Sequence, residues 1–268
     1  MVTRFRPPAV AGMFYPDDPG ELRSMVEGFL ADAGSRRQGP TPRACRAIVA
    51  PHAGYVYSGP IAGTAFDALS SEGVERVAVL GPSHFVPAKG LVLPTAQAMS
   101  TPLGPVAIDP EGAAAALSLP QVSRNDAVHA REHSIEVELP FLQVRFPQAR
   151  VVPLAVGVAT PDDVAEVIAR LLDVDGMRVV ISSDLSHYLP YESAVEADAE
   201  TAQAITRLDP TLSSVQACGV YPLNGMLLAA SRAGWSCRAL DLRNSGDTAG
   251  DRRRVVGYGA FAFEEPHA

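Results

Sequence analysis

The chain has 268 residues, 47% of them hydrophobic, and a formal net charge of −8 at pH 7. This length allows a substantial buried core, in one large domain or at most two. No apolar stretch approaches the roughly 18 residues of a membrane-spanning helix, and no basic tract extends beyond the "DRRR" of 251–254, so neither a membrane nor nucleic acid is expected as a partner.

Cysteine use and the first residues bear on the compartment. Cys45, Cys218 and Cys237 are an odd number at wide spacing, which argues against a disulfide framework and favours a reducing compartment. The opening "MVTRFRPPAVAGMFYP" holds no continuous apolar region, so a signal peptide is not expected. The sequence therefore predicts a cytoplasmic protein.

Short apolar runs alternate with helix-period segments along the chain. The predicted helices cover 20–31, 59–70, 110–117, 134–146, 161–173, 191–206 and 222–233, and 31–44 reads as a linker. The predicted strands cover 45–50, 76–81, 90–94, 105–109, 149–157, 177–183, 237–245 and 254–263. Several of these strands are apolar on both faces, as in a sheet that helices cover on both sides.

This alternation predicts one α/β domain over 1–268, a three-layer α/β/α sandwich with a central sheet. The short, closely spaced strands between residues 76 and 109 predict hairpins, so the sheet is expected to be mixed rather than purely parallel. The last strand, 254–263, alternates more clearly than the others and is predicted to lie nearer an edge.

Polar side chains follow three of the predicted buried strands. His52 follows "AIVA", His84 follows "VAVLG", and Asp184 and His187 follow "VVISS". In open α/β sheets ligands bind beyond the carboxyl ends of the strands, so these side chains converge if the three strands are parallel neighbours. A lone histidine at a strand end is usually structural, but three of the chain's six favour a shared site. Neutral imidazole is the commonest metal ligand in proteins, so a divalent metal is predicted there.

Cys218 is a further candidate ligand or reactive group. It lies in "ACGVYP", before a helix that Pro222 opens. A thiol beside a helix N-terminus is favoured as thiolate by the helix dipole. The alternative is an inert buried cysteine, which is the stronger expectation for Cys45 and Cys237 inside predicted strands.

The segment "HAREHSIEVELPFLQVRF", 129–146, lacks the HExxH pattern of zinc proteases. Ser134 is expected to cap its helix, which places Glu132 and His133 at the helix start, either facing a cleft or in solvent. The glycine-rich "NSGDTAGDRRRVVGYG", 244–259, is neither a P-loop nor GxGxxG. A loop that closes over the site is the better interpretation of that segment.

Seven motifs together resemble the Memo family, also called protein B of the AmmeMemoRadiSam system, over essentially the whole chain. They are "PAVAGMFYP", "APHAGYVYSG", "LGPSHF", "EHSIEVELPFLQ", "SSDLSHY", "ACGVYPLNGML" and "NSGDTAGDRRRVVGYGAFAF". That family is related in structure to class III extradiol dioxygenases of the LigB type, which use non-haem iron. The resemblance therefore implies a LigB-like fold.

The resemblance also implies roles for individual residues. His52 and His84 match the two metal-binding histidines, and Cys218 matches the cysteine that the family has near the metal, where LigB-type dioxygenases have glutamate. His187 matches the acid–base histidine of those dioxygenases, with Asp184 beside it. A thiolate is softer than a carboxylate and is itself oxidisable, so the exchange widens the choice of metal to Zn or Cu.

The surrounding cleft is expected to include Glu132, His133, Tyr55 and Tyr221. Animal Memo proteins carry histidine where this chain has Tyr221 and tryptophan where it has Phe14. The phosphopeptide binding attributed to those animal members is therefore not carried over to this chain.

The leading functional hypothesis is a cytoplasmic metal-dependent redox enzyme of the oxygenase type, with Fe(II) as its metal and an unknown substrate. The first alternative is a non-catalytic metal-binding adaptor that uses the cleft for a peptide or partner protein. The second is a zinc hydrolase, in which the metal activates water. The resemblance adds radical-SAM and AMMECR-type proteins as partners.

Overall fold

A computed structural model describes residues 5–36 and 45–266, and its centre is a mixed sheet that contains nine of the described strands. Eight lie in the order β10-β12-β2-β9-β3-β8-β4-β7, and β11 pairs with β12. Their bounds are β2 Cys45–Ala50, β3 Arg76–Pro82, β4 Leu91–Leu93, β7 Val122–Arg124, β8 Arg150–Val156, β9 Met177–Ser182, β10 His187–Leu189, β11 Ser236–Asn244 and β12 Val255–Glu264.

The middle of the sheet is parallel and buried on both faces. Strands β2, β9, β3 and β8 run in one direction, with Val49 opposite Ile181 and Leu80 opposite Leu154. Successive side chains point to opposite faces of a strand, so Ile48 packs into one core and Val49 into the other. This explains why the strands are apolar along their whole length, as the sequence predicted.

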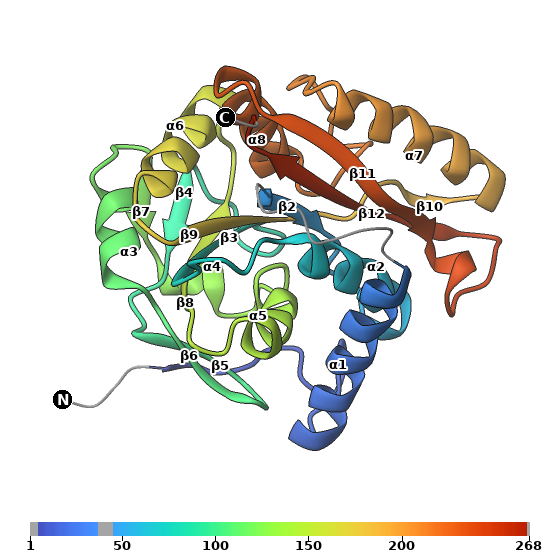
Figure 1. Cartoon of the computed structure of the whole chain (residues 1–268), viewed down its shortest axis with the longest axis horizontal. Helices are drawn as coiled ribbons and strands as arrows, with labels where there is room; N and C mark the ends of the chain where they lie inside the picture. The colour runs from blue at the N-terminus through green and yellow to red at the C-terminus, as the bar shows by residue number, and fades with distance from the viewer. Residues whose placement is uncertain (1–4, 37–44, 267–268) are drawn as a thin grey trace.

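Helices cover both faces of the sheet and complete the three layers (Figure 1). One face carries α1 Pro19–Arg36, α2 Tyr55–Ala68 and α5 Leu139–Arg145. The other carries α3 Pro110–Leu117, α6 Pro161–Leu172, α7 Tyr191–Thr206 and α8 Val220–Arg232. Short helical turns are α4 Asp126–His129, η1 Glu136–Glu138 and η2 Ser245–Asp247. The predicted α/β/α sandwich with a mixed sheet is confirmed.

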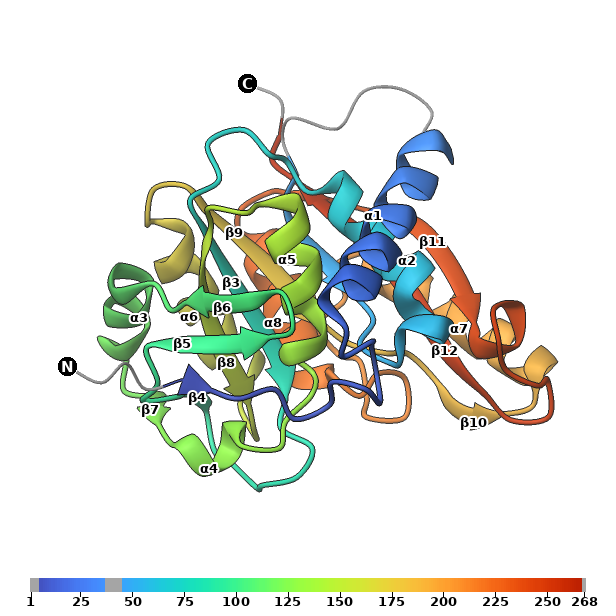
Figure 2. The ribbon, with the colours of Figure 1, turned by 90° about the horizontal axis from the view of Figure 1, so that it is seen from below.

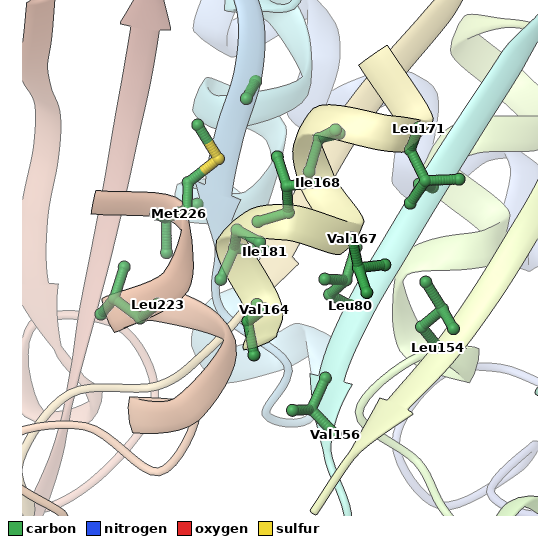
Figure 3. Close-up of a cluster of buried hydrophobic side chains, with 14 of the residues drawn as sticks. Leu80, Leu154, Val156, Val164, Val167, Ile168, Leu171, Ile181, Leu223 and Met226 are labelled. Atoms are coloured by element: carbon green, nitrogen blue, oxygen red, sulfur yellow. The ribbon is translucent and has the colours of Figure 1, made fainter. Parts of the chain in front are cut away.

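Helix α6 shows how sequence pattern becomes packing. Its apolar residues recur every three or four positions and face the sheet and α8 (Figure 3). Thr160 caps the helix through a capping box with Asp163, which satisfies two free backbone amides. Within the described ranges, no helix is both long and apolar enough to cross a membrane.

A hairpin predicted between residues 76 and 109 is present, but the first two strands of that range do not form it. Among the strands predicted between residues 76 and 109, β3 and β4 do not pair with each other, and the hairpin there is β5 Ala98–Thr101 with β6 Gly104–Ala107. That hairpin joins β1 Phe5–Arg6 in a separate small sheet (Figure 2).

Strand β12 lies next to the edge of the sheet, as predicted, because it pairs with β2 on one side and with the outermost strands β10 and β11 on the other. Its alternation comes from glycines that make room for close neighbours. A Cβ at Gly257 would lie 1.9 Å from the Asp198 carboxylate, and one at Gly259 would lie 2.5 Å from the Phe261 ring.

The helix predicted over 134–146 is broken into η1 and α5. Pro140 lies at the start of α5, where its missing N–H and its ring are tolerated but would disrupt a continuous helix. Ser134 caps nothing and donates instead to the Pro82 carbonyl at 2.9 Å. Helix α1 extends through Arg36, and residues 37–44 of the predicted linker lie outside the described residues.

The N-terminal segment is fixed to the domain by one buried carboxylate. Glu136 forms an ion pair with Arg6, accepts the backbone N–H groups of Ala9 and Val10 at 2.8–3.0 Å, and accepts the Tyr15 hydroxyl at 2.5 Å. Because both ionic side chains are buried, each depends on the other for solvation.

We expect Glu136→Gln to lower the free energy of unfolding by about 3 kcal/mol, because it leaves a buried guanidinium without its counter-charge. Glu27→Gln is the matched control, since Glu27 forms an exposed pair with Arg23 and should cost less than about 0.5 kcal/mol. Urea unfolding followed by circular dichroism measures both. Equal stability of the two variants would contradict this role for Glu136.

Candidate metal centre

The strand-end residues converge as the sequence predicted. Strands β2, β9 and β3 are parallel neighbours, so His52, His187 and His84 leave the sheet at the same edge. The residues that follow these strands therefore form one site although they are far apart in the sequence.

Three imidazoles form a group that could hold a metal ion. The ligand atoms of His52, His84 and His133 all lie within 4.8 Å of one another. The ring centroids are 5.3 Å apart for His52 and His84, 5.4 Å for His52 and His133, and 4.7 Å for His84 and His133. Such a set suits Zn, Cu, Fe or Ni. His133, predicted only to line the cleft, is the third member of this histidine triad, and Cys218 is not part of it.

Glu132 orients two of the three histidines. Its Oε1 accepts from His84 Nδ1 at 2.9 Å and from the backbone N–H groups of His133 and Ser134 at 3.0 Å, while Oε2 accepts from the His84 backbone N–H at 2.6 Å. Burial opposes ionisation of this carboxyl group, but the hydrogen bonds and charge of His84 and the amide of Ser134 outweigh it and lower the pKa of Glu132 to about 2. The proton on His84 Nδ1 leaves Nε2 free to bind a metal.

His52 is oriented by a buried network on the other side. Its Nδ1 lies 2.8 Å from Ser182 Oγ, which donates to the Ser134 carbonyl at 2.6 Å and lies 2.9 Å from Glu138 Oε1. Burial raises the pKa of Glu138 well above its usual range, although the hydrogen bond from Ser182 opposes this. Ser182 Oγ can also accept from His52 Nδ1, which leaves Nε2 of His52 as the ligand atom.

Two imidazoles of the triad, those of His52 and His133, are in the form that binds metal. Burial, followed by the charges of His84 and His133, lowers the pKa of His52 well below its usual value. Burial also lowers the pKa of His133 to about 4, although Glu132 opposes this. A neutral imidazole has a lone pair for a cation, so neither ring needs to lose a proton at neutral pH.

Asp184 and His187 lie beside the histidine triad. Asp184 Oδ1 accepts the His52 backbone N–H at 2.8 Å, and burial raises the pKa of this carboxyl group to about 6. His187 Nδ1 lies 2.8 Å from the Leu185 carbonyl. Since a carbonyl oxygen only accepts, Nδ1 carries the proton and Nε2 is left as an acceptor.

Cys218 touches the triad without belonging to it. Its Sγ lies 3.4 Å from His52 Nε2 and accepts the Asp184 backbone N–H at 3.3 Å. The expectation that the start of a helix favours the thiolate is wrong, because burial and the Asp184 charge raise the pKa of this thiol to about 12. A cation bound beside Sγ would be needed to remove its proton.

These groups open onto a cavity of about 1010 Å³. The cavity is lined by the triad together with Asp184, His187 and Cys218, and its remaining walls include Phe14, Tyr188, Leu189, Thr201, Val215 and Gln216. It is large enough for a small-molecule ligand. The site thus combines a candidate metal centre, a histidine with a free acceptor nitrogen and a substrate-sized space.

Comparison with known proteins gives one consistent result. A family model for Memo-like proteins matches residues 6–262. A MEMO1 family protein of Sulfolobus acidocaldarius is 37% identical, with 96% of this chain and 99% of the relative covered. A MEMO1 family protein of Methanopyrus kandleri is 38% identical, with 96% and 98% covered. This chain belongs to the MEMO1 family. The family resemblance seen in the sequence is therefore confirmed across most of the chain.

Two tyrosines predicted for the cleft of this MEMO1 family chain line neither the metal cavity nor the pocket that adjoins it. Tyr55 is buried in the core, where its hydroxyl donates to the Val137 carbonyl at 2.7 Å and its ring packs against Phe141. Tyr221 lies in the first turn of α8 and is partly exposed. Tyr57, two residues after Tyr55 in the same helix, lines the adjoining pocket instead.

The sequence did not predict that several other residues belong to the site. Phe14, held by the N-terminal segment, packs on His133 with ring centroids 4.8 Å apart. Ser182 and Glu138 act only through contacts that the fold creates. The signal available for His133 was its place beside Glu132 in "REHS", which indicated a cleft residue but not a ligand.

Proposed function

We propose that this chain is a metal-dependent enzyme that acts on a small molecule, with the metal on His52, His84 and His133. The observation that carries the proposal is the convergence of three imidazole ligand atoms within 4.8 Å on the wall of a cavity of about 1010 Å³. The triad would bind the cation, and the cavity would bind the substrate.

The chemistry of the donor set fits a divalent transition metal. All three donors are imidazoles, and two of them are oriented by a buried carboxylate that accepts from or lies close to their Nδ1 atoms. When bound, the metal would supply Lewis-acid polarisation and, as Fe(II) or Cu, electron transfer. We favour Fe(II) and a redox reaction, because the family resemblance points to iron-dependent dioxygenases and the metal would face the open cavity.

His187 is the residue that would move a proton. Its Nδ1–H is held by the Leu185 carbonyl, so Nε2 is free to accept a proton from a substrate in the cavity. A base held in one tautomer needs no rearrangement before it reacts. Asp184, which also lines the cavity, adds a negative charge that stabilises the imidazolium once it forms.

A zinc hydrolase is the second candidate, and the donor set itself favours it. Three histidines and an open position are the ligand set of one well-known class of catalytic zinc sites. In that reaction the same His187 would accept the proton of the attacking water.

Anaerobic purification followed by metal analysis tests the proposal. The chain is reconstituted separately with Fe(II) and Zn(II), dialysed and assayed for metal per chain, oxygen uptake and ester hydrolysis. One Fe(II) per chain with oxygen uptake supports the redox reaction, and one Zn(II) with hydrolysis supports the alternative. No retained metal, or metal retained without turnover of any compound tested, would contradict an enzymatic role.

We expect His187→Gln to retain one metal per chain while turnover falls by roughly 100-fold or more, the usual contribution of a general base. Glutamine can still donate to the Leu185 carbonyl but cannot take up a proton. Elemental analysis and initial rates on the same preparation separate the two effects. Loss of metal in this variant would instead make His187 a ligand.

A further inference from the structure

A second pocket adjoins the metal cavity. It has a volume of about 470 Å³ and shares five lining residues with the larger cavity: Phe14, His133, Asp184, His187 and Tyr188. The residues found only in the second pocket include Tyr57, Ser245, Gly250, Asp251, Arg254 and Tyr258. A ligand at the metal centre can therefore extend past His187 into this second lobe.

Tyr258 brings a free donor into the second lobe. Its side chain is only 1% exposed, and its hydroxyl has no hydrogen-bond partner among the described residues. Burial and the nearby Asp184 raise the pKa of this phenol, so the O–H is retained. A hydroxyl that lines a cavity can obtain a hydrogen-bond partner from a ligand.

Arg254 brings a cation to the same lobe. Its guanidinium carbon lies 5.2 Å from the centroid of the Tyr188 ring, and within 5–36 and 45–266 it forms no ion pair with a carboxylate. Asp251 also lines the lobe and is close to Arg254 in sequence. Its carboxylate accepts from Arg253, from the backbone N–H at 2.8 Å and from Nη2 at 2.9 Å.

Both acids that line the lobe already have a partner. Asp184 directs one oxygen to the His52 backbone N–H, and Asp251 is paired with Arg253. The lobe offers a ligand the phenol O–H of Tyr258 and the guanidinium of Arg254, with the aromatic rings of Phe14, Tyr57 and Tyr188 as walls.

We infer that the second lobe binds a carboxylate group of a planar, aromatic or unsaturated substrate, with Tyr258 and Arg254 as its donors. The inference rests on the proposed function, because it assumes that the rest of the substrate reaches the metal centre. A phenol and a guanidinium can serve the two oxygens of one carboxylate, while the aromatic walls suit a flat molecule.

Benzoate and its neutral isostere benzamide are suitable probes. Each is titrated into the full-length chain after dialysis against a chelator, with binding followed by calorimetry. We expect benzoate to bind more tightly than benzamide. Tyr258→Phe and Arg254→Met should each weaken benzoate roughly tenfold or more, since each removes a hydrogen bond to a charged group, and should leave benzamide within about threefold.

Arg252→Met is the matched control, because Arg252 lies over the Tyr191 ring at 4.2 Å and does not line the lobe. Benzoate affinity should be unchanged in this variant. Equal affinity for benzoate and benzamide in the parent chain, or unchanged benzoate binding in both Tyr258→Phe and Arg254→Met, would overturn the inference. Arg254 is exposed, so its variant remains informative even if Tyr258→Phe is destabilised.

Metal analysis of the parent chain, with the same titration before and after metal loading, distinguishes this inference from the proposed function. If metal analysis shows that the triad holds no metal but benzoate still binds through Tyr258 and Arg254, the carboxylate site stands and the metal proposal fails. If benzoate binds only to metal-loaded chain and is insensitive to both variants, it is bound to the metal, and the carboxylate site is overturned.

Discussion

Replacing His133 with alanine should remove the metal as completely as replacing His52 or His84. Each change deletes one of three converging ligand atoms, and we expect each to weaken metal affinity by more than about 100-fold, beyond the roughly 10- to 100-fold effect of losing a supporting residue. Cys218→Ser should have a much smaller effect, because the thiol lies beside His52 rather than within the triad.

Metal-binding titrations with Fe(II) under anaerobic conditions and with Zn(II) in air provide the measurement. His129→Ala is the control for removal of a buried histidine, since its Nε2 lies against the Val92 carbonyl and it is not part of the triad. This control should keep full metal stoichiometry even if it loses stability. If Cys218→Ser loses the metal while His133→Ala retains it, the ligand set is His52, His84 and Cys218, as the family resemblance implies.

Two members of the triad could be predicted from sequence because their placement depends on a simple rule. His52 and His84 each follow a short apolar strand, and strands that are apolar on both faces belong to the parallel centre of a covered sheet. The carboxyl ends of such strands share an edge, so the convergence of these residues required only that the strands be neighbours.

The third member could not be predicted in this way. His133 follows no strand, and its position depends on Glu132, which binds the backbone and side chain of His84 across the fold. The helix expected to begin at Ser134 does not do so, because the Ser134 hydroxyl and amide are both used to hold this loop. Long-range hydrogen bonds of this kind leave no periodicity in the sequence.

Strand β12 shows a second limit of sequence patterns. Its alternation of small and large residues predicts a place near the edge of the sheet, which is correct, but it does not predict that the strand is antiparallel to β2. Because of this direction its first residues return to the edge of the sheet where the histidines gather, and they bring Tyr258 into the second lobe. The functional role of this strand thus follows from its direction, which the pattern alone does not reveal.

Glu132→Gln should disrupt the metal centre while leaving every ligand in place. The carboxylate accepts from His84 Nδ1 and from three backbone N–H groups, and an amide would turn an NH₂ group toward some of these donors. His84 would then lose its fixed tautomer, and we expect metal affinity to fall roughly 10- to 100-fold.

Glu136→Gln supplies the matched control for that experiment, because Glu136 is an equally buried glutamate on the same segment that binds Arg6 and the N-terminal backbone rather than a histidine of the triad. It should destabilise the fold but keep metal affinity within about threefold. Unfolding curves and metal titrations on both variants separate stability from ligand orientation. If the two variants lose the same metal affinity at matched stability loss, Glu132 acts only as a structural anchor, and the orientation of His84 must come from elsewhere.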